Sequence, residues 1–197
     1  MSTAPLPFLT PDQYLEIEQN AEFKSEYWNG QMYAMAGGTG RHSDAAGGLL
    51  VAFRTRLKGR GCGVFNSDLR VRDGENGLYT YPDLAVVCGK PVFGPAHTLI
   101  NPLVLVEVLS PSTEAKDRGF KFARYRHIES FREYVLISPE QPRVETYLLQ
   151  ADRSWRYQSI EGLQSAVAFG SLALEIPLAE IYDGIMFEDW FATAPGA

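Results

Sequence analysis

The sequence predicts an α/β fold in which a mixed β-sheet is flanked by two main helices. Three observations predict it. Apolar residues recur at helical spacing over residues 41–58, two strongly apolar β-type runs cover 84–88 and 103–109, and three further β-prone runs follow residue 131. The expected element order is α-β-β-α-β-β-β-α-β-β-β. A chain of 197 residues with this pattern is expected to form one domain, residues 1–197.

Capping and turn residues define the first elements. Thr10, followed by a proline, predicts the N-cap of a short helix over about 11–20. Asn29-Gly30 is a strong two-residue hairpin signal, and it lies between two β-prone runs within residues 25–36. A short helix followed by a hairpin is therefore expected.

The long helix begins after the glycine-rich GGTG segment, and its apolar positions share one face: Ala46, Leu49, Leu50, Phe53 and Leu57. The other elements are expected in this order: a strand with polar interruptions over 62–72, a turn at 73–77, strands at 84–88 and 103–109 separated by a Gly/Pro-rich loop, a helix capped by Ser112 or Thr113 and running to about His127, a β-meander over 132–160, a strand near 172–176 and a short acidic helix near 178–182.

Composition places the chain among soluble globular proteins, with 45% hydrophobic and 21% charged residues. No apolar run approaches the roughly 20 residues of a membrane span, and the first residues do not resemble a signal peptide. A cytoplasmic location and no membrane partner are expected. Cys62 and Cys88 form no CxxC motif, so both are expected to be reduced and buried, without a thiolate metal site.

Charge is distributed unevenly along the chain. The net charge is −6, but residues 41–156 contain 17 basic and 13 acidic residues. Two basic clusters lie in this part: Arg54, Arg56, Lys58 and Arg60, and Lys116, Arg118, Lys121, Arg124 and Arg126. A local basic face can bind a polyanion even on an acidic protein. On charge alone, however, two solvated helix faces are the simpler interpretation.

A carboxylate in an apolar strand is the main functional signal. The strand period places Leu103, Leu105, Glu107 and Leu109 on one face, where an ionised side chain is costly unless it is paired. Asp83 stands at the start of the neighbouring predicted strand. Two carboxylates at the rim of a core repel each other unless a cation lies between them, so a Mg²⁺ or Mn²⁺ site with oxygen ligands is expected.

The following helix adds a possible third component. Asp117 and Lys121 are four residues apart and share a helical face. Lys121 could stabilise charge on a phosphate, but on spacing alone a surface ion pair is the more ordinary interpretation. His42 lies on the apolar stripe of the long helix and could point towards the site, although a lone histidine is more often a capping or core residue.

The motifs PDLAVVCG, LVEVLSPSTEAKDRGFKFARYR and REYVLI, in this order and spacing, closely resemble the Uma-type restriction endonuclease family of the PD-(D/E)xK nuclease superfamily. The resemblance covers nearly the whole chain, from KSEYWNGQMYAMAGGTGRH to LAEIYDGI. It implies a restriction-endonuclease-like mixed β-sheet flanked by helices.

The resemblance also implies roles for individual residues. Asp83 would be the Asp of the superfamily motif and Glu107 its second acidic residue. The lysine that usually follows two residues later is replaced by Leu109, and the family resemblance moves this role to Lys121. Glu26, in SEYWNG, would be a further metal or water ligand.

The implied function is a metal-dependent endonuclease that hydrolyses nucleic-acid phosphodiester bonds, with DNA expected as the substrate. Arg118 and Arg124 would hold the nucleic-acid backbone, Asp117 and His42 would neighbour the site, and a homodimer is compatible with the superfamily. Two alternatives are open: a non-catalytic nucleic-acid- or protein-binding module that kept the nuclease fold, and a metal-dependent phosphohydrolase for small substrates. A buried carboxylate together with Lys121 argues against a pure binding module.

Overall fold

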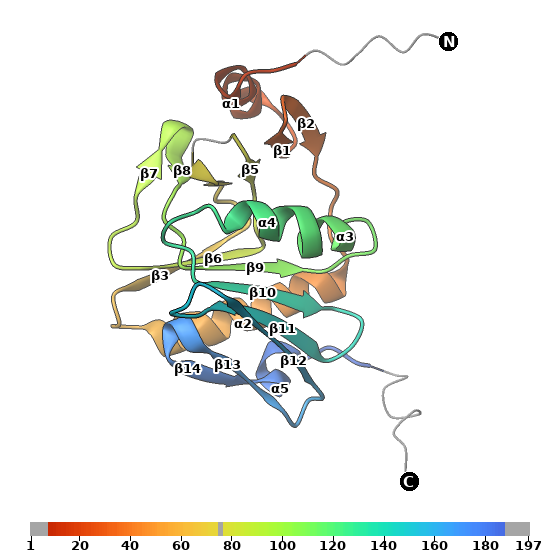
Figure 1. The fold of residues 1–197 in the computed structure, drawn as a ribbon. Coiled ribbons are helices and arrows are strands. Elements are labelled where there is room, and N and C mark those ends of the chain that lie inside the picture. The colour runs from red at the N-terminus through yellow and green to blue at the C-terminus, as the bar shows by residue number, and fades with distance from the viewer. Residues whose placement is uncertain (1–7, 75–76, 188–197) are drawn as a thin grey trace.

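The computed structural model describes residues 8–74 and 77–187 and has an α/β architecture (Figure 1). The described helices are α1 (Pro11–Asn20), α2 (Gly40–Leu57), α3 (Glu114–Lys116), α4 (Phe122–Tyr125) and α5 (Leu178–Ile181). Three short helical turns lie wholly within the described residues: η2 (Pro95–His97), η3 (Asp117–Lys121) and η4 (Gly170–Leu172).

The larger sheet is mixed, as predicted. Its strands, in spatial order, are β12 (Trp155–Glu161), β11 (Arg143–Leu149), β10 (Glu133–Ser138), β9 (Val104–Val108), β6 (Leu84–Cys88) and β3 (Cys62–Asn66). The central pair β9–β10 is parallel, and every other neighbouring pair in this sheet is antiparallel. The two strands expected to carry the acidic residues are indeed neighbours, with Leu84 opposite Val106.

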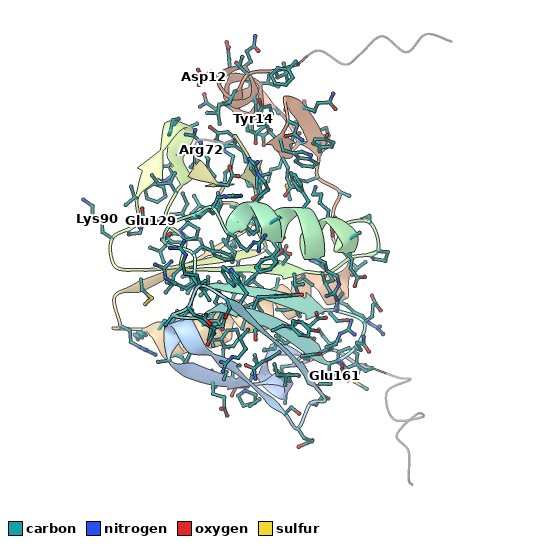
Figure 2. All side chains as sticks on the ribbon, viewed as in Figure 1. Asp12, Tyr14, Arg72, Lys90, Glu129 and Glu161 are labelled. Carbon is teal, nitrogen blue, oxygen red and sulfur yellow. A yellow bond between two sulfur atoms is a disulfide. The ribbon has the colours of Figure 1, made fainter. Side chains whose placement is uncertain are left out.

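The second six-stranded sheet is built from short strands. In spatial order they are β2 (Gln31–Ala34), β1 (Ser25–Trp28), β5 (Tyr79–Thr80), β4 (Val71–Arg72), β8 (Thr98–Leu99) and β7 (Phe93–Gly94). Figure 1 shows this sheet and α1 at the N-terminal end of the molecule, above the larger sheet in that view. A stacked tyrosine cluster fills the space between α1 and the sheet, with Tyr14 (labelled in Figure 2) against Tyr27 and Tyr79.

The N-terminal predictions are confirmed. Thr10 caps α1 through a reciprocal capping box with Gln13. Asn29 and Gly30 both have positive φ, 50° and 76°, as a type I′ turn between β1 and β2 requires. The long helix is also present as α2, with Thr39 as its N-cap.

Helices cover both faces of the larger sheet (Figure 1). On one face, Leu49 and Phe53 of α2 pack against Val104 and Val106 of β9, together with α5 and the hairpin of β13 (Ala166–Phe169) and β14 (Leu174–Pro177). On the other face, Tyr125 of α4 packs against Leu105 and Leu109. Alternate residues of β9 therefore face two different cores.

Three details of the predicted elements are wrong. Residues 62–72 do not form one strand, because β3 ends at Asn66 and the chain turns before β4 enters the other sheet. The loop between β6 and β9 contains β7 and β8, and the strand β13 was not predicted. These short segments pair with distant strands, and no local pattern signals such pairing.

The helix after β9 also differs from its prediction. It covers residues 114–125, but its centre is the π-helical turn η3, a wider turn than an α-helical one and frequent at functional sites. Thr113 occupies the N-cap position without a capping hydrogen bond, and its hydroxyl is instead within 2.9 Å of the Ser110 hydroxyl. The predicted side-chain cap is therefore wrong.

The cysteines correct a further expectation. Cys62 and Cys88 are opposite each other in the antiparallel pair β3–β6 and form a disulfide, and Cys88 is exposed. They are neither reduced nor both buried, because strand register brings together residues 26 positions apart. Disulfides are rare in reducing compartments, so this bond counts against the expected cytoplasmic location. Within the described residues, no helix has the length and apolarity needed to cross a membrane.

Candidate active site

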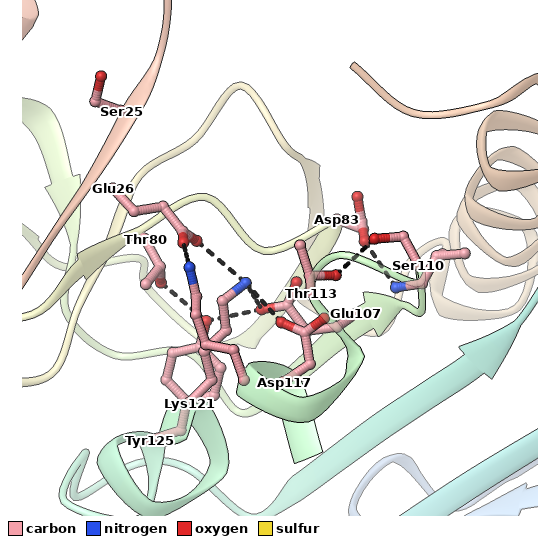
Figure 3. A network of polar contacts seen from close by, with 12 residues as sticks. Ser25, Glu26, Thr80, Asp83, Glu107, Ser110, Thr113, Asp117, Lys121 and Tyr125 are labelled. Atoms are coloured by element: carbon pink, nitrogen blue, oxygen red, sulfur yellow. Dashed lines mark hydrogen bonds and ion pairs between the residues drawn. The ribbon is translucent and has the colours of Figure 1, made fainter. Parts of the chain in front are cut away.

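Lys121 lies at the centre of a buried cluster of carboxylates (Figure 3). Its Nζ is 3.1 Å from Glu26 Oε1, 3.0 Å from Glu107 Oε1 and 3.0 Å from Asp117 Oδ1. All four residues are at most 5% exposed. An ammonium in this position balances only part of the negative charge around it, and buried charges of this kind are stable only when paired.

Three separate segments supply the cluster. Glu26 comes from β1 of the smaller sheet, Glu107 from the centre of the larger sheet, and Asp117 and Lys121 from the two ends of the π-helical turn η3. The sequence prediction that Asp117 and Lys121 share a helical face is confirmed. The ordinary interpretation of a surface pair is wrong, because the η3 turn faces the sheet and both side chains are buried.

Glu107 has two partners in the same core. In addition to Lys121, Tyr125 donates its hydroxyl hydrogen to Glu107 Oε1 at 2.8 Å. The Tyr125 oxygen lies 2.9 Å from Thr80 Oγ1, which can donate to it in turn. The apolar strand therefore tolerates Glu107 because the packed helix supplies a cation and a hydroxyl donor.

Tyr125 was missed in the sequence, although a signal existed. Asp117, Lys121 and Tyr125 follow one another at intervals of four residues, which predicts a single polar stripe on the helix. Thr80 and Lys116 were also missed. The smaller sheet positions Thr80, and no spacing relative to Glu107 indicates its place.

Asp83 lies directly before β6, beside the cluster. Its Oδ2 accepts a hydrogen bond from the Val108 backbone amide at 2.7 Å, which ties the carboxylate to the end of β9. His42 Nε2, from the first turn of α2, lies 3.5 Å from the same oxygen. The sequence prediction that His42 points towards the site is confirmed in its geometry.

Glu26 joins the cluster to the helix that follows β9. One of its oxygens is paired with Lys121, and the other is 2.6 Å from Lys116 Nζ. The structure thus places Glu26 beside Glu107, as the family resemblance implied. Both of its oxygens are bound by lysines, so its metal-binding role stays a prediction.

The site has an excess of negative charge. Burial, with Asp117, Asp83 and Glu26 nearby, raises the pKa of Glu107 well above its usual value, although Lys121 acts in the opposite direction. Burial disfavours the charged form of Lys121, but the surrounding carboxylates raise its pKa well above its usual value. Lys121 therefore favours its charged form, and an additional cation would favour ionised Glu107.

The hydrogen bond to Asp83 raises the pKa of His42, and the Asp83 charge acts in the same direction against the effect of burial. The imidazole therefore favours its protonated form beside this carboxylate. His42 therefore adds a titratable group beside Asp83 to the two lysines of the cleft.

A cleft of about 490 Å³ gives access to these groups. Its walls come from β2, the segment before α2, the start of β6 and the segment between β9 and η3. The charged residues that line it are Glu26, His42, Asp83, Glu107, Lys116, Asp117, Lys121 and Glu140. Its volume is sufficient for a nucleotide-sized ligand.

The residues fit a divalent cation bound mainly by water. In the described part of the chain, Asp83 Oδ1 and Glu107 Oε2 form no hydrogen bond or ion pair with protein groups. No three His, Cys, Asp or Glu side chains among these residues are arranged as a preformed metal site. Mg²⁺ is usually held by only one or two carboxylates and keeps several waters, so two free carboxylate oxygens on adjacent strands suit it.

The two arginines predicted to contact nucleic acid, Arg118 and Arg124, instead pair with carboxylates of the chain itself. Arg118 donates to both oxygens of Glu145 and to Glu114, and Arg124 Nε is 2.7 Å from Asp73. Neither arginine lines the cleft. Both side chains have carboxylate partners within the chain, so the structure gives them a role in holding the helix.

Comparisons with known proteins agree with this architecture. A family model named Uma2, described as "Putative restriction endonuclease", matches residues 11–179. Two proteins of Synechocystis sp. strain PCC 6803 are similar over most of the chain: slr1290 is 36% identical over 188 residues, covering 94% of this chain and 97% of the relative, and sll1609 is 31% identical over 176 residues, covering 88% and 99%.

A crystal structure from Anabaena variabilis ATCC 29413, described as "a putative nuclease belonging to DUF820", superposes with a TM-score of 0.71. The two sequences are 21% identical, and the match covers 88% of this chain and 97% of the other. This similarity confirms the predicted fold class. Because the family model matches most of the sequence, the chain belongs to the Uma2 family.

Proposed function

We propose that the protein is a metal-dependent nuclease that hydrolyses phosphodiester bonds of nucleic acid, with DNA as the substrate. The observation that carries the proposal is the position of Lys121, buried among Glu26, Glu107 and Asp117 at the wall of an open cleft. A scaffold gains little stability from burying so many charges. Family membership and the fold of the Anabaena protein support a nuclease-like activity.

Asp83 and Glu107 would hold the Mg²⁺ or Mn²⁺ ion. Such an ion supplies Lewis acidity and an activated water at neutral pH. The excess of negative charge around Glu107 supports a cation there. Glu26 would act differently from a simple metal ligand, because it holds Lys116 and Lys121 in position.

Residues of the chain would stabilise the phosphate charge and position the metal-binding carboxylates. Lys121 would stabilise negative charge on the phosphate, since three carboxylates keep its ammonium charged and fixed. Tyr125 would orient Glu107 through its hydroxyl, and His42 would orient Asp83. These positioning contacts exist before substrate binds, which lowers the cost of organising the site.

A binding module that kept the fold is the second candidate. One observation favours it: Glu26 and Glu107 are already neutralised in part by Lys121, so the cluster is stable without an additional ion. A binding module would use the cleft for nucleic acid but would have no need for free oxygens on Asp83 and Glu107.

Cleavage and metal titration separate the two candidates. The wild-type protein is expected to cleave plasmid or single-stranded DNA with Mn²⁺ and not with EDTA. Asp83→Ala and Glu107→Ala should both abolish cleavage, whereas the exposed control Glu175→Ala should not. Calorimetry should detect Mn²⁺ binding that Asp83→Ala removes. Equal Mn²⁺ binding by the wild-type protein and Asp83→Ala would reject the metal assignment. No cleavage of any DNA or RNA would favour the binding module.

A further inference from the structure

The β1–β2 hairpin carries an aromatic pair on the same face as Glu26. Glu26 and Tyr33 are directly opposite each other in the antiparallel register, so their side chains lie on one face of the hairpin. Trp28 is two residues from Glu26 on β1 and therefore shares that face. The hairpin that delivers Glu26 to the carboxylate cluster thus also delivers Tyr33 to the wall of the cleft.

The two rings form a platform. The centroids of Trp28 and Tyr33 are 3.5 Å apart, and their planes differ by only 3°, so Trp28 covers one face of the tyrosine ring. Tyr33 is nevertheless 37% exposed. Among the described residues, no second ring stacks on Tyr33. A flat ring that is supported from behind and exposed towards the cleft is suited to stacking on a planar ligand.

Lys116 connects this platform to the carboxylate cluster. Its Nζ is 2.6 Å from Glu26 Oε2 and 4.0 Å from the centroid of the Trp28 ring. One side chain therefore touches both the aromatic pair and a member of the site. Tyr33 and Lys121 line the same cleft, so a group stacked on Tyr33 would share this cleft with the phosphate that Lys121 is proposed to bind.

The charges that line this cleft give it little affinity for a polyanion. Five acidic residues line it, against two lysines and one histidine, and the whole chain has a net charge of −6. Phosphate contacts provide most of the affinity in ordinary duplex binding. Here another source of affinity is needed, and stacking of bases on aromatic side chains is the usual one for unpaired strands.

We propose that Tyr33, supported by Trp28, stacks on an unpaired base of the nucleotide next to the phosphate to be cleaved, so that the substrate is single-stranded DNA. This inference rests on the proposed nuclease function and names its substrate class. In a duplex, both faces of each base are covered by neighbouring base pairs, and no base face is available to Tyr33 without unstacking. Because every base has a π-face, the contact selects unpaired strands with little dependence on sequence.

Binding measured without turnover tests this inference. Fluorescence anisotropy in EDTA would compare labelled DNA of about 12 nucleotides as a single strand, as the same strand with abasic sites, and as a blunt duplex. The proteins are the wild type, Tyr33→Ala, Tyr33→Leu and Tyr33→Phe. The matched control is Tyr157→Ala, which removes an exposed tyrosine of β12 that does not line the cleft. Circular dichroism melting confirms that each variant is folded.

Tyr33→Ala and Tyr33→Leu are expected to weaken single-strand binding roughly tenfold or more, while Tyr33→Phe and Tyr157→Ala bind like the wild type. Abasic sites should weaken wild-type binding by a similar factor and leave Tyr33→Ala unaffected. Unchanged single-strand affinity in a folded Tyr33→Ala protein would overturn the inference, as would wild-type binding that favours the duplex.

A parallel Mn²⁺ cleavage assay separates this inference from the proposed function. Single-strand binding that depends on Tyr33, without any cleavage, would support the platform and reject the nuclease proposal. Cleavage of duplex and single strand at equal rates, indifferent to Tyr33→Ala, would support the nuclease proposal and overturn the platform.

Discussion

Strand β9 presents two different cores from one stretch of backbone. On the side of α2, Val104, Val106 and Val108 lie among aliphatic and aromatic side chains. On the side of η3 and α4, the alternate residues include Leu105 and Leu109, but the position between them is Glu107, paired with a buried lysine. The first side can be explained by apolar burial alone. The second side contains charges that burial penalises, an arrangement typical of functional sites.

The comparison also shows what offsets the free-energy cost of burying these charged side chains. On its core side the charged cluster borders a layer of buried tyrosines and phenylalanines, including Tyr125, Tyr134 and Phe131, and on its other side it faces the cleft. Tyr134 donates a hydrogen bond to the backbone carbonyl of Asp117 at 3.0 Å, which holds the π-helical turn in place. Burial of apolar side chains on the α2 side of the sheet stabilises the fold. This stabilisation offsets the free-energy cost of holding a charged cluster rigid on the opposite side.

The largest effect is expected from removing the central cation. Lys121→Met should lower the free energy of unfolding by about 3–5 kcal/mol, because Glu26, Glu107 and Asp117 stay buried without their partner. It should also reduce cleavage by roughly 10²–10³-fold. Urea denaturation and single-turnover cleavage measure the two quantities. The exposed control Lys90→Met should change neither.

A stability loss below about 1 kcal/mol for Lys121→Met, the range of exposed ion pairs, would mean that the cluster is not buried in solution. An unchanged cleavage rate in a folded variant would remove Lys121 from the site.

The apolar face should respond to substitution in stability alone. Leu49→Ala, in α2, is expected to cost about 2–5 kcal/mol through lost burial and a cavity, since Leu49 is fully buried. Below its melting temperature the variant should retain wild-type cleavage. Thermal unfolding and cleavage at a temperature where both proteins are folded measure this. Abolished cleavage in the folded Leu49→Ala protein would show that the two faces are not functionally separate.

A smaller effect, of opposite sign, is expected for Glu107→Gln. Without metal, this change should raise stability by roughly 1–2 kcal/mol at neutral pH, because burial and nearby carboxylates raise the pKa of Glu107. A raised folded pKa means that the ionised form is destabilising. The gain should therefore be absent below about pH 4, where Glu107 is protonated in both states, and should grow as the pH rises.

The melting temperatures of Glu107→Gln, the wild type and the exposed control Glu175→Gln are measured in EDTA across this pH range. A fall of several degrees for Glu107→Gln at neutral pH would show instead that the Lys121–Glu107 pair is a net stabilising contact.

The smallest effect on nucleic-acid binding and cleavage is expected for Arg118→Gln. Arg118 is paired with Glu145 and Glu114 and does not line the cleft. Stability should fall by roughly 1–3 kcal/mol, because Glu145 is buried and loses its bidentate partner, whereas the salt dependence of DNA binding should not change. A salt slope reduced by about one unit would indicate a lost phosphate contact and would restore Arg118 as a nucleic-acid-binding residue.

Much of the site was visible in the sequence because it depends on local spacing and family motifs. An acidic residue inside an apolar strand pointed to Glu107. The spacing of four placed Asp117 and Lys121 on one helical face, but only the family resemblance assigned Lys121 to the site. The neighbouring positions of Asp83 and Glu107 were predicted correctly, since strand period and order determine which residues lie at the same end of a sheet. Capping and turn chemistry likewise predicted α1 and the β1–β2 hairpin, and apolar residues at helical spacing predicted α2.

Contacts between segments far apart in the chain were decided only by tertiary structure. The sequence alone did not show that Lys116 contacts Glu26, that Thr80 supports Tyr125, or that a π-helical turn directs Asp117 and Lys121 into the core. The disulfide between Cys62 and Cys88 has the same origin, because strand register creates the pairing. Local patterns determine helices, strands and the faces they present, whereas the packing of several elements decides which charged side chains are desolvated and which of them form pairs.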